Sequence, residues 1–385
     1  MSLSPETVTL QGCLLTPQGW LRGALRLHAG RIDVIDGEPI EEAAARALAA
    51  AQPQQWPLVL PGFVDAHVHG GGGHDVMEGG DAGRHVAHLH ARHGTTTLLA
   101  TTMTAPLSEI EAALVALAPL CRERARGGAD IAGVHLEGPY ISPERLGAQP
   151  AATSHATLEG IQALRALAPL RLVTLAPELP GHLELIAPLR ASGLLVQIGH
   201  SNGRYEDGVA ALAQGASGFT HLFNAMTGLH HREPGMAGAA LAHATHAEII
   251  PDLLHVHPGA IRAALRAIPC LYCVSDATAG TDMPDGAYRL GSMPVIKCQG
   301  GVRLADGRLA GSALTMDQAL GNLVSLGLTL AEASRRVATI AADYLGLADR
   351  GCLERGRRAD LALLDGVLQL RGVFVEGERI DLAAG

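Results

Sequence analysis

The sequence predicts an α/β fold in which a TIM (β/α)8 barrel carries a small β-sandwich domain formed from both chain ends. From Leu58 to about residue 280, apolar strand-like runs alternate with Gly-containing or polar loops and with helices, which is typical of parallel β/α units. Eight such runs occur, the number that closes a TIM barrel. Strand-like pieces also lie near both ends of the chain. We therefore expect residues 1–57 and 349–385 to form the two parts of the sandwich, and residues 58–348 the barrel.

The composition suits a large, intracellular barrel. The chain has 385 residues, of which 48% are hydrophobic and only 3% aromatic, enough to fill one large core. No run approaches the roughly 20 apolar residues of a membrane helix, and the first residues show no signal peptide, so we expect a cytoplasmic protein with no membrane partner. The six scattered cysteines suit reduced thiols. A net charge of −9 argues against binding to nucleic acid.

In chain order, the first sixty residues predict strands at 8–15, 24–27 and 31–35, followed by a polar, Ala-rich stretch. The eight barrel strands are expected at 58–64, 95–101, 131–136, 171–176, 194–198, 218–222, 248–254 and 271–275. Apolar residues recur every three or four positions in the segments between them, which predicts helices at 107–125, 158–167, 181–192, 206–214 and 258–268. A hairpin at 288–310, helices at 312–326 and 329–345, and strands at 356–364 and 372–375 complete the chain.

Metal-binding residue types follow the expected strands, at the end of the barrel where TIM-barrel chemistry takes place. One such residue, Glu137, ends an apolar run and would be costly to bury without a partner, which could be a metal ion, an arginine or the start of a helix. Because six strand ends carry such residues, we favour a metal-dependent hydrolase over independent structural roles. These residues are His67 and His69, Glu137, His200, His221, His255 and Asp276.

Seven motifs carry a family resemblance. PGFVDAHVHG (residues 61–70) is similar to the first-strand signature of the amidohydrolase superfamily. With HLEGPY, GHSN, THLFNAM, HREPGMAG, LHV and SDAT in this order, the chain resembles the N-acetylglucosamine-6-phosphate deacetylase family over most of its length. The resemblance implies hydrolysis of the N-acetyl group of N-acetyl-D-glucosamine 6-phosphate in amino-sugar catabolism, and it implies a homodimer. It also implies one or two divalent metal ions per subunit, with Zn²⁺ expected and Fe²⁺ or another ion as alternatives.

The resemblance assigns roles to individual residues. It implies that Glu137, His200 and His221 bind the principal metal ion, and that His67 and His69 suit a second one. It makes Asp276 the catalytic acid and base, and places His255 beside the scissile carbonyl. The implied substrate contacts are Ala148, Gln149, Asn224, Ala225, Arg232, His255, Leu309, Ala310 and Gly311.

Two positions depart from the family pattern, and other interpretations stay open. Gln149 stands where the family usually has a histidine that contacts the ligand, and Leu253 where it usually has a glycine near the ligand. Without the resemblance, a surface salt bridge to Glu233 would be the preferred role of Arg232. The alternative functions are deacetylation of a related sugar phosphate such as N-acetylgalactosamine 6-phosphate, a different amidohydrolase, and a catalytically inactive barrel that senses sugar phosphates.

Overall fold

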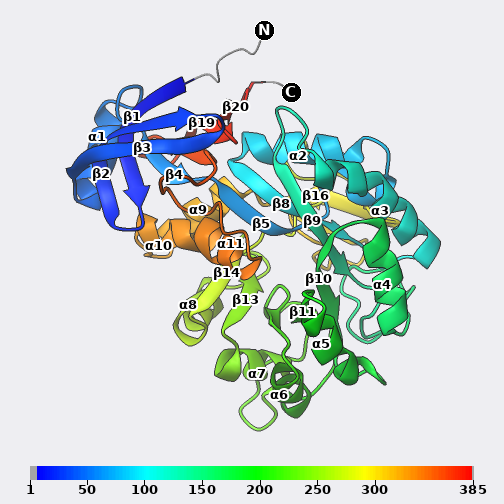
Figure 1. The fold of residues 1–385 in the computed structure, drawn as a ribbon. Helices are drawn as coiled ribbons and strands as arrows, with labels where there is room; N and C mark the ends of the chain where they lie inside the picture. The colour runs from blue at the N-terminus through cyan, green and yellow to red at the C-terminus, as the bar shows by residue number, and fades with distance from the viewer. Residues whose placement is uncertain (1–6, 384–385) are drawn as a thin grey trace.

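The computed structural model, which describes residues 7–383, contains the predicted barrel and a small β-domain built from both ends of the chain (Figure 1). The barrel strands run in parallel in the order β12-β11-β10-β9-β8-β5, and β13 and β14 form the remaining pair. A parallel bridge between Val68 and Ala277 connects the end of β5 to the segment after β14. The eight strands are β5 (Phe63–Val68), β8 (Thr95–Thr102), β9 (Asp130–Glu137), β10 (Leu170–Leu175), β11 (Leu195–Ile198), β12 (Gly218–Phe219), β13 (His246–Ile249) and β14 (Cys270–Cys273).

Helices cover the outside of the barrel (Figure 1). Their buried faces are rich in Leu, Ile and Ala, and these side chains join the core formed by the strands. The helices are α2 (Ala82–Arg92), α3 (Leu107–Arg122), α4 (Leu158–Leu167), α5 (His182–Ala191), α6 (Tyr205–Ala213), α7 (Gly235–His243), α8 (Pro258–Ala267) and α9 (Met316–Ser325). The predicted helix at residues 329–345 consists of two short helices, α10 (Leu330–Ser334) and α11 (Ile340–Tyr344). A π-helical turn at Arg335–Thr339 joins them. Between residues 7 and 383, no helix combines the length and the apolar character needed to span a bilayer.

The small β-domain is one continuous seven-stranded sheet, in the order β20-β19-β18-β4-β1-β2-β3. One face has its own apolar core, which includes Leu14, Leu25 and Phe374, and the other face packs against the barrel through residues such as Leu60 and Val373. Its strands are β1 (Thr7–Thr16), β2 (Gly19–His28), β3 (Arg31–Pro39), β4 (Leu58–Pro61), β18 (Leu361–Leu364), β19 (Leu370–Val375) and β20 (Glu378–Arg379). The expected β-domain from both chain ends is thus confirmed, while the domain boundaries at residues 57 and 349 stay a prediction.

Four sequence-based expectations were wrong in detail. The predicted seventh barrel strand, residues 248–254, is β13 (His246–Ile249), so His255 lies in the loop after this strand and not at its end. The predicted first barrel strand, residues 58–64, is two strands, because β4 pairs with β1 and β18 whereas β5 enters the barrel. The change of sheet occurs at Gly62, where a Cβ atom would lie 2.3 Å from the side chain of Thr96. The Ala-rich stretch contains a helix, α1 (Glu42–Ala51). The predicted hairpin is a three-stranded sheet of β15 (Gly286–Leu290), β16 (Met293–Cys298) and β17 (Gly301–Arg303).

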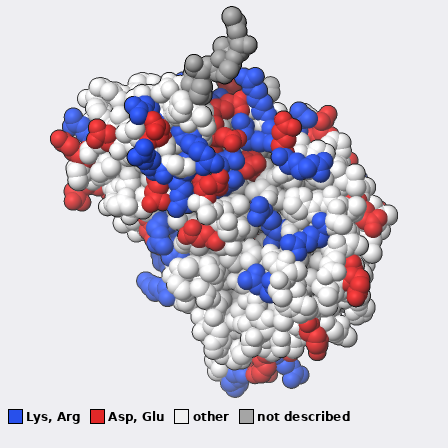
Figure 2. All heavy atoms as spheres, in the orientation of Figure 1, with Lys and Arg blue, Asp and Glu red and all other residues white. Residues whose placement is uncertain are grey.

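Charged side chains are unevenly distributed over the face drawn in Figure 2. Acidic and basic residues are mixed over the small β-domain and its junction with the barrel, while the lower part of the barrel shows mostly uncharged atoms. At the junction, Arg350 and Arg358 lie 2.6 and 3.3 Å from the same carboxylate oxygen of Asp130. These ion pairs connect the last part of the chain to the start of β9.

Candidate active site

A cavity of about 140 Å³ opens at the carboxyl ends of the barrel strands. Six of the residues predicted from the strand ends line it: His69, Glu137, His200, His221, His255 and Asp276. His67 lies directly behind them and is fully buried. The structure thus brings the predicted metal-binding and catalytic residues together in one place.

The first group consists of Glu137, His200 and His221. Glu137 is the last residue of β9, and its Oε1 lies 3.1 Å from Nε2 of His200 and 3.0 Å from Nε2 of His221. The two Nε2 atoms are 3.1 Å apart. Both histidines have positive φ, at 47° and 29°, in the turns that follow their strands. These turns direct both side chains toward Glu137 at a cost in backbone strain, which is common at functional sites.

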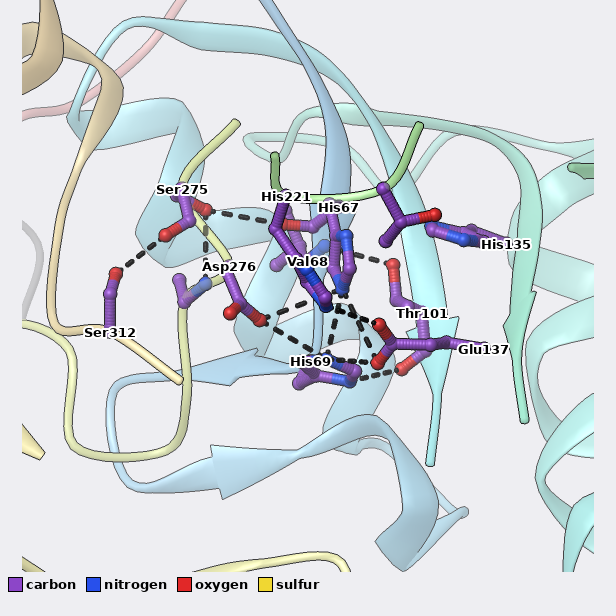
Figure 3. A network of polar contacts seen from close by, with 12 residues as sticks. His67, Val68, His69, Thr101, His135, Glu137, His221, Ser275, Asp276 and Ser312 are labelled. Carbon is purple, nitrogen blue, oxygen red and sulfur yellow. Dashed lines mark hydrogen bonds and ion pairs between the residues drawn. The ribbon is translucent and has the colours of Figure 1, made fainter. Parts of the chain in front are cut away.

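The second group consists of His67, His69 and Asp276, which point toward one another in Figure 3. His67 and His69 are two residues apart at the end of β5, so their side chains leave the same face, and their Nε2 atoms are 3.1 Å apart. Oδ1 of Asp276 lies 3.5 and 3.3 Å from these two nitrogens. Oε2 of Glu137 lies 3.5 and 3.3 Å from the same nitrogens. The carboxylate of Glu137 therefore stands between the two groups.

The hydrogen bonds around the histidines leave nitrogen lone pairs facing this centre. Nδ1 of His69 donates to the carbonyl of Thr101 at 3.0 Å, and Nδ1 of His200 donates to the carbonyl of Arg145 at 2.8 Å. In a neutral imidazole the other nitrogen then carries a lone pair. Nε2 atoms about 3 Å apart with no proton between them repel each other, and a shared cation removes the repulsion. Both groups are therefore candidate sites for a divalent metal ion.

The carboxylates of Glu137 and Asp276 shift the pKa values of the neighbouring histidines. Burial lowers the pKa of His69, but hydrogen bonds to Asp276 and Glu137 outweigh it and raise the pKa to about 9. Burial raises the pKa of Glu137, but the nearby His67 and His200 outweigh it and hold the pKa well below its usual range. A potential that retains protons on buried imidazoles also attracts a metal cation, so protons and metal compete for these atoms.

A third group, formed by His67, His135 and Glu248, lies deeper in the barrel. Both ring nitrogens of His135 are engaged, with the Ala66 carbonyl at 3.2 Å and the Thr174 hydroxyl at 2.7 Å. Burial lowers the pKa of His135 well below its usual value. Nδ1 of His67 donates to Oε2 of Glu248 at 3.0 Å. This group therefore orients His67, and His135 has no free nitrogen for a metal ion.

His255 is held by the loop after β13. Its Nδ1 donates to Oδ2 of Asp252 at 2.6 Å, while Oδ1 of Asp252 accepts from the backbone N–H groups of Leu254 and His255. Burial lowers the pKa of His255, but Asp252 outweighs it and raises the pKa. Leu253, which stands where the family usually has glycine, has a φ of 65°. The loop thus keeps the left-handed backbone conformation that glycine adopts easily, with a leucine in it.

Most of the predicted substrate contacts line the cavity, and two do not. Ala148, Gln149, Asn224, Ala225, Leu309 and Gly311 lie along its wall together with His255. Ala310 is fully buried behind it, in the small core under the three-stranded sheet. Arg232 is exposed, lines a separate pocket of about 570 Å³, and has its Nη1 2.7 Å from Nε2 of His231.

The sequence did not identify Met103, Gly147 or Leu290, which also line the cavity. Met103 directly follows β8, and its place at a strand end was a signal that could have identified it. Leu290 ends β15, in the three-stranded sheet beyond the barrel, and no local pattern marked it.

Comparisons with known proteins agree with this geometry. Residues 58–380 match the amidohydrolase family. An N-acetylgalactosamine-6-phosphate deacetylase of Escherichia coli O157:H7 is 39% identical over 375 residues, which are 95% of this chain and 97% of that protein. An N-acetylglucosamine-6-phosphate deacetylase of Lysinibacillus sphaericus is 37% identical over 332 residues, 83% and 84% of the two chains.

Solved structures give the same result. A mutant N-acetyl-D-glucosamine-6-phosphate deacetylase of Mycobacterium smegmatis, in complex with N-acetyl-D-glucosamine-6-phosphate, superposes with a TM-score of 0.88 at 33% identity, covering 98% of this chain and 100% of that one. The enzyme of Thermotoga maritima superposes with a TM-score of 0.87 at 29% identity, covering 98% and 99%. The chain therefore belongs to the amidohydrolase family, in the branch that contains the N-acetylglucosamine-6-phosphate deacetylases.

Proposed function

We propose that this chain is a hydrolase that uses a divalent metal ion to remove the acetyl group of N-acetyl-D-glucosamine 6-phosphate, with glucosamine 6-phosphate and acetate as products. The observation that carries the proposal is the meeting of Glu137, His200 and His221 with Asp276 and His255 in one cavity. The identity of 37% to an enzyme named for this activity supports the choice of substrate.

Amide hydrolysis needs an activated water, a polarised carbonyl and a proton for the leaving amine. A divalent ion held by Glu137, His200 and His221 would supply acidity to the water and polarise the acetyl oxygen. Asp276, on the opposite side of the cluster, would accept the proton of the water and pass it to the amine nitrogen. His255, whose pKa Asp252 raises, would donate from Nε2 to the oxygen as negative charge develops on it.

The identity and number of the ions are part of the proposal. Imidazole and carboxylate ligands suit Zn²⁺ and also Fe²⁺. We propose Zn²⁺ at the first group. A second ion would use His67 and His69, with Asp276 beside it.

Recognition of the phosphate is proposed to involve Arg232, in a homodimer. An arginine fork suits a phosphate because its planar donors can bind two phosphate oxygens at once. Because Arg232 is exposed and lines a separate pocket, the contact requires either a movement of its loop or a second copy of the chain that brings Arg232 to the cavity.

A second substrate has its own support. The relative with 39% identity and 97% coverage is named for N-acetylgalactosamine 6-phosphate. The test is acetate release from both sugar phosphates by protein of measured metal content, with the unphosphorylated sugars as controls. The proposal expects release from at least one sugar phosphate that stops on chelation and returns with added metal. Absence of release from both with fully loaded protein contradicts it.

A further inference from the structure

Gln149 has a buried side-chain amide, and both its oxygen and its nitrogen make hydrogen bonds. It lies in the loop between β9 and α4 and is 6% exposed. Its Oε1 accepts a hydrogen bond from the backbone N–H of Thr104 at 2.7 Å. Its Nε2 donates to Oε2 of Glu137 at 2.5 Å. Because a backbone N–H can only donate, the amide has one orientation, in which the NH₂ group faces the carboxylate.

Because of this hydrogen bond, the two carboxylate oxygens of Glu137 have different partners. Oε1 faces His200 and His221 at 3.1 and 3.0 Å, while Oε2 accepts the hydrogen bond from Gln149 and faces His69 at 3.3 Å. A carboxylate oxygen that already accepts a short hydrogen bond has less electron density for a metal ion. The rotation of the Glu137 carboxylate is also fixed, with Oε1 toward the first group.

The same loop holds a second member of the first group. The carbonyl of Arg145 accepts from Nδ1 of His200 at 2.8 Å, and the N–H of Ser142 donates to the backbone carbonyl of His200 at 2.9 Å. The N–H of Gln149 donates to the carbonyl of Leu146 at 2.8 Å, which closes the turn that carries the side chain. The loop therefore holds Glu137 through Gln149, and His200 through the carbonyl of Arg145.

From these contacts we propose that Gln149 is a positioning residue, which acts through Glu137 to set metal affinity at the first group. It holds Oε1 toward His200 and His221, and by occupying Oε2 it lowers the contribution of Glu137 to a second ion beside His69. The proposal rests on the proposed metal site and does not depend on the identity of the substrate.

The test is a titration of metal-stripped protein with Zn²⁺, and with Co²⁺ for its absorption spectrum. Gln149→Leu removes the donor and keeps an apolar volume, and Gln149→Ala is the second variant in case the first does not fold. The first-ion affinity is expected to fall 10–100-fold, the usual effect of losing a hydrogen bond to a ligand residue.

Gln197→Leu is the matched control, because Gln197 is also fully buried, but its amide bonds the hydroxyls of Tyr272 and Thr220. This variant should keep the first-ion affinity within about three-fold, well short of the 10–100-fold expected for loss of a bond to a ligand residue. Unchanged metal affinity in both Gln149 variants overturns the proposal. Equal loss of affinity in Gln197→Leu also overturns it, since any buried amide would then have the effect. The metal titration uses no substrate, so it can be interpreted even if the protein does not catalyse the proposed deacetylation.

Discussion

Asp276→Asn is the substitution that most directly tests the proposed chemistry. Asp276 has a φ of 51°, a left-handed conformation that asparagine accepts readily. Its backbone is held independently of its side chain, because its N–H donates to the carbonyl of His67 at 2.9 Å and its carbonyl accepts from Ser312 at 2.7 Å. The variant should therefore fold, with the shape of the cavity preserved.

The magnitude follows from what asparagine cannot do. An amide cannot take the proton of the attacking water, and loss of a positioned acid or base typically costs 10²–10⁴-fold in rate. We therefore expect kcat to fall by at least about 10²-fold, which corresponds to roughly 3 kcal/mol or more of activation free energy. Glu137, His200 and His221 are untouched, so the first metal ion should stay bound.

The assay combines kcat from acetate release with metal content of the same preparation. Asp285→Asn, at an exposed position on the loop after β14, is the control and should match the wild type. Near-normal turnover of Asp276→Asn would refute the role as base. Loss of the first ion would instead make Asp276 a metal ligand before anything else.

Three further predictions concern the metal, the phosphate and pH. Glu137→Ala should yield folded protein with little bound metal, because Oε1 serves the first group and Oε2 faces the second; full metal occupancy by elemental analysis would exclude it as a ligand. Arg232→Ala should raise KM for the phosphorylated sugar far more than for the unphosphorylated one, since a lost charge-assisted fork acts on binding; equal effects on both would show that Arg232 does not hold the phosphate. Burial lowers the pKa of His90 to about 4, so this group stays neutral in the folded protein while it protonates near 6.5 in the unfolded chain. Stability is therefore lost as pH falls from about 6.5 to 4, by up to roughly 3 kcal/mol. Urea unfolding at both pH values should show this loss reduced in His90→Gln, and an unchanged pH dependence would contradict it.

The fold was predictable where the local pattern had a single interpretation. The eight barrel strands and the five helices predicted between them are confirmed, and α4 (Leu158–Leu167) has the predicted bounds, whereas α2 and α7 were not predicted. The two strands within residues 58–64 could not be separated from the sequence, because this run is apolar throughout and both β4 and β5 are fully buried. Only tertiary contacts decide that the chain changes sheets at Gly62. The helix α1 was missed although its alanines favour a helix, because only Ala45 and Ala49 are buried and no stripe of large apolar residues marks it.

The candidate site was predictable because barrel geometry brings strand ends together, however far apart they lie in sequence. That rule placed Glu137, His200, His221 and Asp276 in one cavity. The rule says nothing about segments outside the barrel, so it missed Leu290, which ends β15. The direction of the Gln149 side chain depends on the backbone of Thr104, 45 residues earlier, which no local pattern encodes.

The continuous sheet of the small β-domain has a consequence for biosynthesis. β4 pairs with β1 on one side and with β18 on the other, and β18 is separated from β4 in sequence by the entire barrel. While the ribosome is still making the barrel, β4 has an unpaired edge whose N–H and C=O groups can recruit a strand from another chain. The strands at the far end of the sequence close that edge last, so C-terminal truncation before Leu361 should cause aggregation of nascent protein even though every residue of the catalytic cavity has been made.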